Sequence, residues 1–235
     1  RDRYCTAEVH EGYAELLAEI EMVQPNIIVP MGNLALWALT GNWGILKWRG
    51  SQLTTEGGIK VIPTIHPAAI LREWSQRAVV LNDLRRVKHH MGSRTYDNRP
   101  DWNFAVRPTF PWVVKTLDML LEHAALGELW IDFDIETVAG HIDCIGLSWT
   151  RTEAICIPFI TRSSREGYWQ AAEEAEIVWR IYQLLTHPAV RVRWQNGLYD
   201  AQYVYRHWHF IPRGAQDTMI SQHSLFCALP KGLSF

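Results

Sequence analysis

Apolar and polar positions along residues 1–91 predict helices separated by short strands. Apolar side chains recur every three or four residues over residues 8–23, which predicts an amphipathic helix that Pro25 ends. Strands are then expected at residues 26–31 and 60–64, and helices at residues 33–39 and 69–90. Because each strand precedes a helix, this part of the chain is expected to form a parallel α/β layer.

The pattern changes after residue 91. Residues 92–107 are rich in Gly, Ser, Asn, Pro and charge, as linkers are, and their second half can pair as an edge strand. Three extended runs then follow one another without a helix between them, which predicts an antiparallel meander. Strands are expected at residues 128–136, 142–149, 153–159 and 190–194, and helices at 111–126, 169–186, 198–208 and 217–226. We therefore predict domains at 1–91 and 108–235, with a mixed sheet flanked by helices in the second.

The composition fits a folded protein with a sizeable core. Of the 235 residues, 48% are hydrophobic and 20% charged, which excludes a disordered or collagen-like chain. The 23 basic and 25 acidic residues give a net charge of −2, so bulk charge alone would not hold the chain on nucleic acid. Residues 45–99, however, carry 10 Lys or Arg against 4 Asp or Glu. This stretch is expected either to contact phosphate or to form a solvated helix face.

Cysteine spacing and hydropathy indicate the kind of cellular compartment in which the protein is expected. The four cysteines form no C-x-x-C pair, which favours small buried thiols in a reducing compartment over a disulfide or zinc framework. No apolar run approaches the ~18 residues of a membrane span, and no export signal opens the chain. A soluble protein with no membrane partner is therefore expected.

Three acids alternate with apolar residues in the first strand of the meander. Asp132, Asp134 and Glu136 share one face of this strand, and alternate side chains on a strand lie roughly 7 Å apart. Like charges this close are costly unless a cation lies among them or one acid is neutral. A divalent metal site is the interpretation we favour, and an edge strand with a solvated acidic face is the alternative.

A second acidic motif lies where a strand gives way to a helix. Asn196 and Asp200 are four residues apart and hence on the same side of the first helical turn, and Gly197 permits a tight turn. Helix capping by Asn196 explains this motif equally well when it is considered alone. The two acidic motifs together favour a site.

These motifs resemble those of a known nuclease family. Phe-Asp134-Ile-Glu136-Thr, then Gln-Asn196-Gly-Leu-Tyr-Asp200 and Gln-Asp217-Thr-Met, resemble the proofreading 3′–5′ exonuclease domain of family A DNA polymerases. That domain is DnaQ-like and has an RNase H-like fold. The chain's final tract, residues 229–235, is similar to one in phage-type members. The family's third motif, Tyr-x-x-x-Asp, does not occur before Phe235, so a domain truncated before that motif is expected.

The resemblance implies a two-metal hydrolysis with Mg²⁺ or Mn²⁺. Asp134 would bridge both ions, Glu136 would complete the tighter site, and Asp200 would hold the second ion largely through water. Asn196 would position the terminal nucleotide. Asp132 is expected outside this cluster, and Asp217 is expected to be structural. Because one acid and a water-orienting Tyr would be missing, the isolated chain is expected to bind DNA but trim it poorly.

The first ninety residues resemble the C-terminal half of family 4-type uracil-DNA glycosylases. The similarity rests on Lys47-Trp-Arg49-Gly, on Pro63-Thr-Ile-His66-Pro-Ala-Ala-Ile-Leu-Arg72, and on the Asn-Asp-Leu tract that follows. It implies that His66 stabilises a departing uracil, that Ile70 or Leu71 fills the vacated base position, and that Arg72 touches phosphate. Arg49 is expected among the basic residues near His66. A His before Pro as a capped structural residue is the alternative.

Departures from the glycosylase pattern limit what this half is expected to do. Ala68 stands where the family has Ser, and the family's iron–sulfur cysteine falls at Gly12, so no iron–sulfur cluster is expected. The first motif of the family, with its uracil pocket, would precede Arg1. The glycosylase half is therefore expected to contact DNA without excising uracil.

Together these features predict a DNA-replication hydrolase of phage or bacterial origin, acting in the cytoplasm. It would remove nucleotides from single-stranded DNA or a primer 3′ end, and a polymerase domain would be encoded downstream. A non-catalytic DNA-binding module and an RNA-trimming DnaQ-like nuclease are the alternatives. The tract from Pro63 to Arg72 favours DNA.

Overall fold

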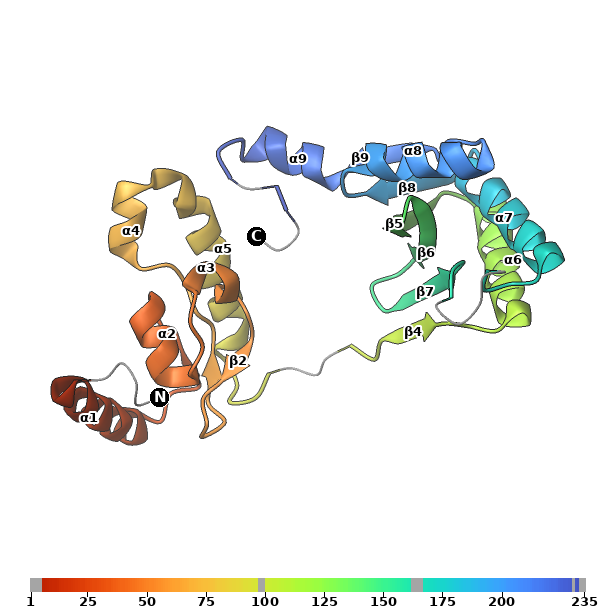
Figure 1. Cartoon of the computed structure of the whole chain (residues 1–235). Coiled ribbons are helices and arrows are strands. Elements are labelled where there is room, and N and C mark those ends of the chain that lie inside the picture. Colours follow the sequence, from red (N-terminus) through yellow and green to blue (C-terminus); the bar gives the residue numbers. More distant parts are fainter. Residues whose placement is uncertain (1–5, 97–99, 162–166, 230, 233–235) are drawn as a thin grey trace. The chain divides into compact units, whose positions relative to one another are not determined.

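The computed structural model describes residues 6–96, 100–161, 167–229 and 231–232. Its contacts divide the chain into one unit of Arg1–Arg99 with Ala228–Phe235 and a second of Pro100–Cys227 (Figure 1). Cys5 and most of the final tract, 229–235, lie outside the described residues. Each unit is considered by itself below.

The first unit is an α/β layer with short strands. Strand β1 (Ile27–Ile28) runs parallel to β3 (Lys60–Val61), and β2 (Leu53–Thr54) pairs antiparallel on the other side of β3. A parallel bridge between Met31 and Thr64 extends the central pair. The helices are α1 (Ala7–Val23), α2 (Asn33–Thr40), α3 (Ile45–Trp48), α4 (Pro67–Arg72) and α5 (Arg77–His90), with the 3₁₀ turn η2 (Trp74–Gln76).

One expectation for this unit needs correction. The single helix expected at residues 69–90 is broken at Glu73, whose non-helical backbone ends α4 and whose carboxylate accepts from Ser75 and Gln76 in the η2 turn. Helix α1 has the expected bounds, but none of its residues is buried against the described parts of the chain. Its apolar stripe therefore adds no core to this unit.

Two cations of the basic stretch lie inside the first unit. Lys60 is fully buried, and its Nζ donates to the carbonyls of His90 and Thr95 and to Ser93 Oγ. Asp83 is equally buried and pairs with Arg49. Buried charges persist only when they are paired or hydrogen-bonded. Lys60 and Arg49 therefore hold the unit together and do not add to its basic surface.

The second unit is built on a six-stranded mixed sheet in the order β4–β7–β6–β5–β8–β9. Strands β4, β7, β5, β8 and β9 are parallel to one another, and β6 runs antiparallel between β7 and β5. Their bounds are β4 Asn103–Val106, β5 Leu129–Val138, β6 His141–Ser148, β7 Glu153–Pro158, β8 Val190–Trp194 and β9 Gly214–Asp217. The helices are α6 Phe110–Leu126, α7 Ala171–Thr186, α8 Gly197–Trp208 and α9 Thr218–Leu225.

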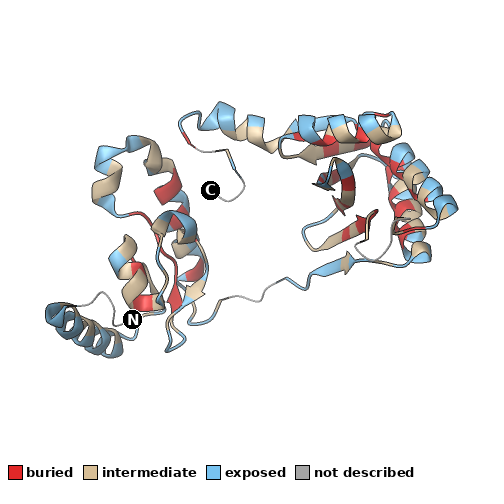
Figure 2. Ribbon diagram, viewed as in Figure 1, coloured by how far each residue is buried: buried red, intermediate tan, exposed pale blue. Residues whose placement is uncertain are grey.

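The core of this unit lies between the sheet and helices α6 and α7 (Figures 1 and 2). In β5 the buried residues Ile131, Phe133 and Ile135 alternate with more accessible acids, as the period of two requires. From α6 and α7, Leu117 and Ile181 pack into the same cluster. The buried side of β5 thus fixes which way its acids face.

Strand β9 has no apolar pattern and is not predicted from the sequence. Its residues, Gly-Ala-Gln-Asp, are mostly exposed, and only pairing with β8 makes them a strand. The other strands and helices of this unit lie within about two residues of their expected positions. The mixed α/β fold class expected for the chain is confirmed.

Candidate functional site

The candidate site lies where β5 and β8 part. The two strands pair in parallel from Leu129 with Val190 to Asp132 with Arg193. Beyond that point β8 turns into α8, while β5 continues to Val138. The chain leaves β5 toward β6 and leaves β8 toward β9, on opposite sides. Such a switch point at the carboxyl ends of parallel strands is where open α/β sheets bind ligands.

Asp134 and Glu136 project from β5 just past the last pair with β8, and both are exposed. Asp200, in the first turn of α8, is only 2% exposed and accepts a 3.0 Å hydrogen bond from the backbone N–H of Ile135. That amide lies between the two strand acids in sequence. One hydrogen bond therefore fastens the helix acid beside both of them.

The acids influence one another electrostatically. Burial raises the pKa of Asp200 to about 6; the Ile135 amide opposes this change, and the charge of Asp134 adds to it. Partial desolvation, and then the charge of Glu136, raise the pKa of Asp134. Holding carboxylates that repel one another in this way costs electrostatic free energy, and a divalent cation bound between them would lower that cost.

The donor set fits a hard cation. Carboxylate oxygens are the ligands that Mg²⁺ prefers in proteins, and Asp134 and Glu136 offer theirs to solvent. Within residues 6–96, 100–161, 167–229 and 231–232, no three His, Cys, Asp or Glu side chains are already gathered around one metal position. The exposed strand acids and the lack of a preassembled three-residue group both fit one arrangement. In it, Asp134 and Glu136 would be direct ligands and Asp200 would act largely through water.

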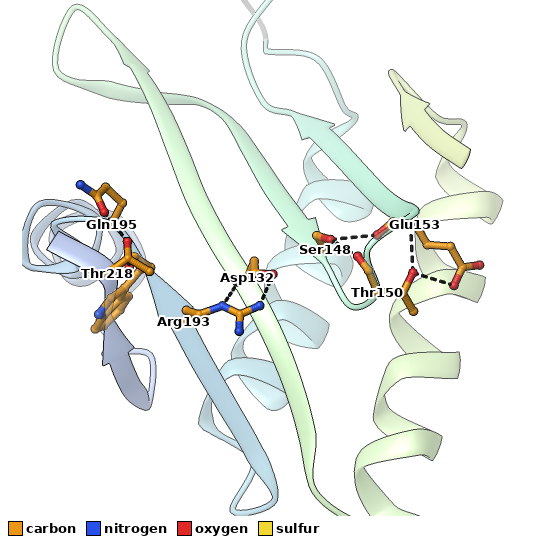
Figure 3. Close-up of polar contacts among 8 residues, drawn as sticks. Asp132, Ser148, Thr150, Glu153, Arg193, Gln195 and Thr218 are labelled. Atoms are coloured by element: carbon orange, nitrogen blue, oxygen red, sulfur yellow. Dashed lines mark hydrogen bonds and ion pairs between the residues drawn. The ribbon is translucent and has the colours of Figure 1, made fainter. Parts of the chain in front are cut away.

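Asp132 has a different partner. Its carboxylate accepts hydrogen bonds from Nε and Nη2 of Arg193, with 2.8 Å between Oδ2 and Nη2 (Figure 3). The side-by-side register of β5 and β8 places the two residues together, and the guanidinium also lies over the Trp130 ring. The charge of Asp132 is thus paired with that of Arg193 at the last residue pair before β5 and β8 separate.

Asp217 fixes the start of α8. Its carboxylate accepts from the backbone N–H groups of Asn196 and Gly197 and also caps α9 through Met219 and Ile220. Partial burial disfavours the ionised form, but these four donors outweigh it and lower the pKa of Asp217. The structural role suggested by the sequence agrees with these contacts.

Asn196 and Gly197 form the turn into α8. Asn196 adopts a left-handed conformation, and its exposed side chain makes no capping hydrogen bond. A Cβ on Gly197 would lie 2.0 Å from the indole of Trp194, so only glycine fits there. Capping by the Asn196 side chain, the alternative explanation of this motif, is therefore not what holds the helix start.

We expect Asp217→Ala to destabilise the second unit by about 2 kcal/mol, because it removes the caps of two helices. Asp217→Asn keeps an acceptor oxygen and should lose less. Urea unfolding of the two variants beside the wild-type chain measures this difference. Equal midpoints for wild type and Asp217→Ala would contradict the role assigned to this carboxylate.

The raised pKa of Asp200 predicts a pH-dependent stability. The folded chain holds this proton more tightly than the unfolded chain does, so stability is lost as pH rises from about 4 to about 6. We expect Asp200→Asn to be more stable than wild type by roughly 2 kcal/mol at neutral pH and by little near pH 4. Urea unfolding in EDTA at both values measures this. A gain independent of pH would show that ionisation is not its cause.

In the first unit, His66 lies at the carboxyl end of the parallel pair β1–β3. It is exposed, and its Nδ1 accepts from the Ala68 N–H, so it caps α4. Gly32 packs against it: a Cβ added there would just touch His66 Cβ, at 3.4 Å, and the φ of +95° at Gly32 disfavours any other residue. His66 therefore serves as a helix cap and still faces solvent.

The residues after His66 divide between core and surface. Ile70 packs against the cluster of Ile65, Val79 and Val80, whereas Leu71 is 81% exposed. Arg72 is also exposed. Of the two apolar residues expected to fill a vacated base position, only Leu71 has the accessibility for it.

Arg49, expected at the DNA surface, is engaged inside the unit. Its guanidinium donates to both carboxylate oxygens of Asp83, with 3.0 Å between Nε and Oδ2, and the side chain is 11% exposed. Thr64 Oγ1 donates to the same carboxylate at 2.8 Å. A phosphate contact would have to compete with this buried pair. Its neighbours in the sequence could not indicate this, because the partner is 34 residues away.

A row of rings on α8 is not singled out by the sequence patterns. Tyr199, Tyr203 and His207 recur every four residues, a spacing that places them on one helix face. Tyr199 OH is 2.7 Å from Thr137 Oγ1, next to Glu136. The regular spacing of aromatic residues beside an acidic motif is the signal that could have revealed them.

The sequence is similar to known proteins in both halves. Residues 4–85 match the uracil DNA glycosylase superfamily, so the N-terminal part of the chain is similar to domains of this superfamily. Over 169 residues the chain is 30% identical to a DNA polymerase of Bacillus phage SP01, covering 68% of this chain and 18% of that protein. Over 77 residues it is 43% identical to a type-4 uracil-DNA glycosylase of Thermotoga maritima, covering 31% of this chain and 40% of that protein. The chain thus spans less than half of each relative.

The solved structures that resemble the chain include Escherichia coli RNase D, an exoribonuclease involved in structured RNA processing. The match covers 56% of this chain and 31% of RNase D, with 16% identity and a TM-score of 0.38.

In the part of the chain that the structure describes, no helix is both long enough and apolar enough to cross a membrane.

Proposed function

We propose that the second unit is the 3′–5′ proofreading exonuclease part of a family A DNA polymerase and that the glycosylase-like unit also binds DNA. The observation that carries this proposal is the hydrogen bond from the Ile135 N–H to Asp200. It joins an acid of α8 to the two acids of β5 at the point where β5 and β8 part. Such a protein would act in the cytoplasm of a bacterial or phage-infected cell.

Each residue has a distinct part in this proposal. Asp134 and Glu136 would hold Mg²⁺ or Mn²⁺ directly, and Asp200 would face the same ions from α8. Bound divalent ions supply Lewis-acid stabilisation of the charge on a transferring phosphoryl group. Asn196, exposed at the turn into α8, would orient the terminal nucleotide. Asp217 would keep that turn in place through its two backbone contacts.

The proposed substrate is DNA because both sequence relatives act on DNA by name, one as a polymerase and one as a glycosylase. The exposed residues His66, Leu71 and Arg72 would contact it in the first unit. Several further cations on α5 are exposed and would add phosphate contacts, namely Arg85, Arg86 and Lys88. We propose that this unit binds DNA without excising uracil.

A trimming assay tests the proposal. A 5′-labelled single-stranded DNA that contains one uracil is incubated with excess chain in Mn²⁺ and then in EDTA, beside an RNA of the same sequence. We expect slow, EDTA-sensitive shortening of the DNA and no alkali-sensitive abasic site. Faster shortening of RNA would favour an RNA-trimming nuclease. Binding without any shortening would favour a non-catalytic module, and abasic sites would overturn the proposal for the first unit.

A further inference from the structure

Three rings on α8 form a continuous row. The centroids of Tyr199 and Tyr203 lie 4.9 Å apart, and those of Tyr203 and His207 lie 6.2 Å apart with planes only 20° from parallel. A fourth ring, His141 at the start of β6, lies 5.4 Å from His207. The row therefore crosses from the helix to the β5–β6 hairpin.

Hydrogen bonds hold both ends of this row. At one end, Tyr199 OH bonds Thr137 Oγ1; at the other, His207 Nε2 is 3.1 Å from the carbonyl oxygen of Gly140. Both partners belong to the β5–β6 hairpin or its turn. Because the hairpin fixes Tyr199 and His207, the two outer rings of α8, little side-chain entropy remains to be lost when a ligand stacks on them.

The row begins next to the candidate acids in the sequence. Tyr199 precedes Asp200, and its partner Thr137 follows Glu136. From there the row runs along α8 to His207, roughly 12 Å for eight residues of helix. A chain end held at Asp200 would have Tyr199, the first ring of the row, one residue away on the same helix.

Accessibility and charge indicate what the row could bind. Tyr199 is 42% exposed and His141 is exposed, whereas Tyr203 and His207 are half-buried, and one side of Tyr203 packs against the core. Arg206, three residues beyond Tyr203 on the helix, is exposed as well. A row of rings that is exposed at both ends and half-buried in the middle, beside an exposed cation, matches the stacking and phosphate contacts by which proteins hold single-stranded nucleic acid.

We propose that Tyr203, His207 and His141 form a base-stacking strip that holds the single-stranded segment leading to a nucleic-acid 3′ end. Arg206 lies beside the strip and contacts the phosphates of that segment. This inference rests on the proposed exonuclease function, since it assigns the carboxylates to the terminal nucleotide. The strip adds affinity for several nucleotides behind the one that is removed.

The test is the affinity of the whole chain for a fluorescein-labelled single-stranded oligonucleotide, measured in EDTA so that no hydrolysis occurs. Tyr203→Leu and His207→Leu keep an apolar side chain but remove the ring, and each is expected to weaken binding about ten-fold. Tyr203→Phe keeps the ring and should bind as wild type does. Thermal unfolding confirms that each variant is folded.

Tyr205→Leu is the matched control. Tyr205 belongs to the same helix and is 55% exposed, but it is two residues from Tyr203 and hence on the other side of α8, beside His209. Its loss should leave affinity unchanged. An equal loss for Tyr205→Leu and the strip variants would overturn the strip, because the effect would not depend on the helix face.

The outcomes separate the strip from the proposed function. Wild-type affinity in a folded His207→Leu variant would overturn the strip, even if Asp134→Ala abolishes trimming. Ten-fold weaker binding in the strip variants, in a chain that trims no substrate, would support the strip and reject the exonuclease. If Tyr203→Leu does not fold, His207→Leu and His141→Leu decide the question.

Discussion

Replacing Asp134 with alanine is expected to lower metal-dependent trimming of a DNA 3′ end by about 100-fold or more, because it removes the acid that faces both of the others. The structure couples Asp134 to Glu136 and to Asp200 through their charges. No described neighbour offers a carboxylate in its place on β5, since Asp132 is held by Arg193. The measurement is the rate of shortening of a 5′-labelled strand in Mn²⁺.

Asp132→Ala is the control for this prediction. It removes an acid from the same face of the same strand, two residues earlier, and leaves the site acids untouched. We expect it to retain most of the trimming activity and to lose at most about 1 kcal/mol of stability, as partly exposed ion pairs do. If Asp132→Ala abolishes trimming and Asp134→Ala does not, the site has been assigned to the wrong acid.

Metal binding gives the same prediction a second readout. An ion that binds only the folded chain raises its unfolding temperature, by an amount equivalent to about 2.7 kcal/mol at 100 times the dissociation constant. We expect Mn²⁺ to stabilise the wild-type chain and Asp132→Ala, and to have little effect on Asp134→Ala. Stabilisation of all three to the same extent would place the ion elsewhere.

Asp83→Asn is expected to destabilise the first unit by about 3 kcal/mol, because it removes the buried carboxylate charge that pairs with the Arg49 guanidinium. Asn still offers an oxygen to Thr64 Oγ1, so the loss reports on charge and not on that hydrogen bond. The close approach of Gly50, where a Cβ would lie 2.7 Å from Asp83 Oδ1, leaves no space for water to replace the partner. Hydrogen exchange of α5 peptides in increasing urea measures the stability of this unit.

A second substitution provides the internal control. Adding Arg49→Met to Asp83→Asn removes both charges, and replacement of a whole buried pair is often close to neutral. We therefore expect the double variant to be more stable than Asp83→Asn alone. If it is less stable, Arg49 contributes through contacts other than this pair, and the assignment of its role is wrong.

Local patterns in the sequence determined much of the frame. The alternation of Ile131, Phe133 and Ile135 with acids follows from the period of a strand, which depends only on neighbouring residues. For the same reason, the bounds of the helices around Val113 and Ile181 could be read from their apolar spacing. The sequence also located the two acidic motifs, since each lies within a few consecutive residues.

The tertiary structure decided which charged groups remain available. Asp132 meets Arg193 across 61 residues, and Asp200 meets the Ile135 amide across 65. Neither contact leaves a local signal, because strand register and crossover connections bring the partners together. Arg49 looks like any other cation of a basic stretch until Asp83 is placed against it. Local periodicity therefore fixed where the acids lie and which way they face, whereas only long-range pairing settled which of them were left free for chemistry.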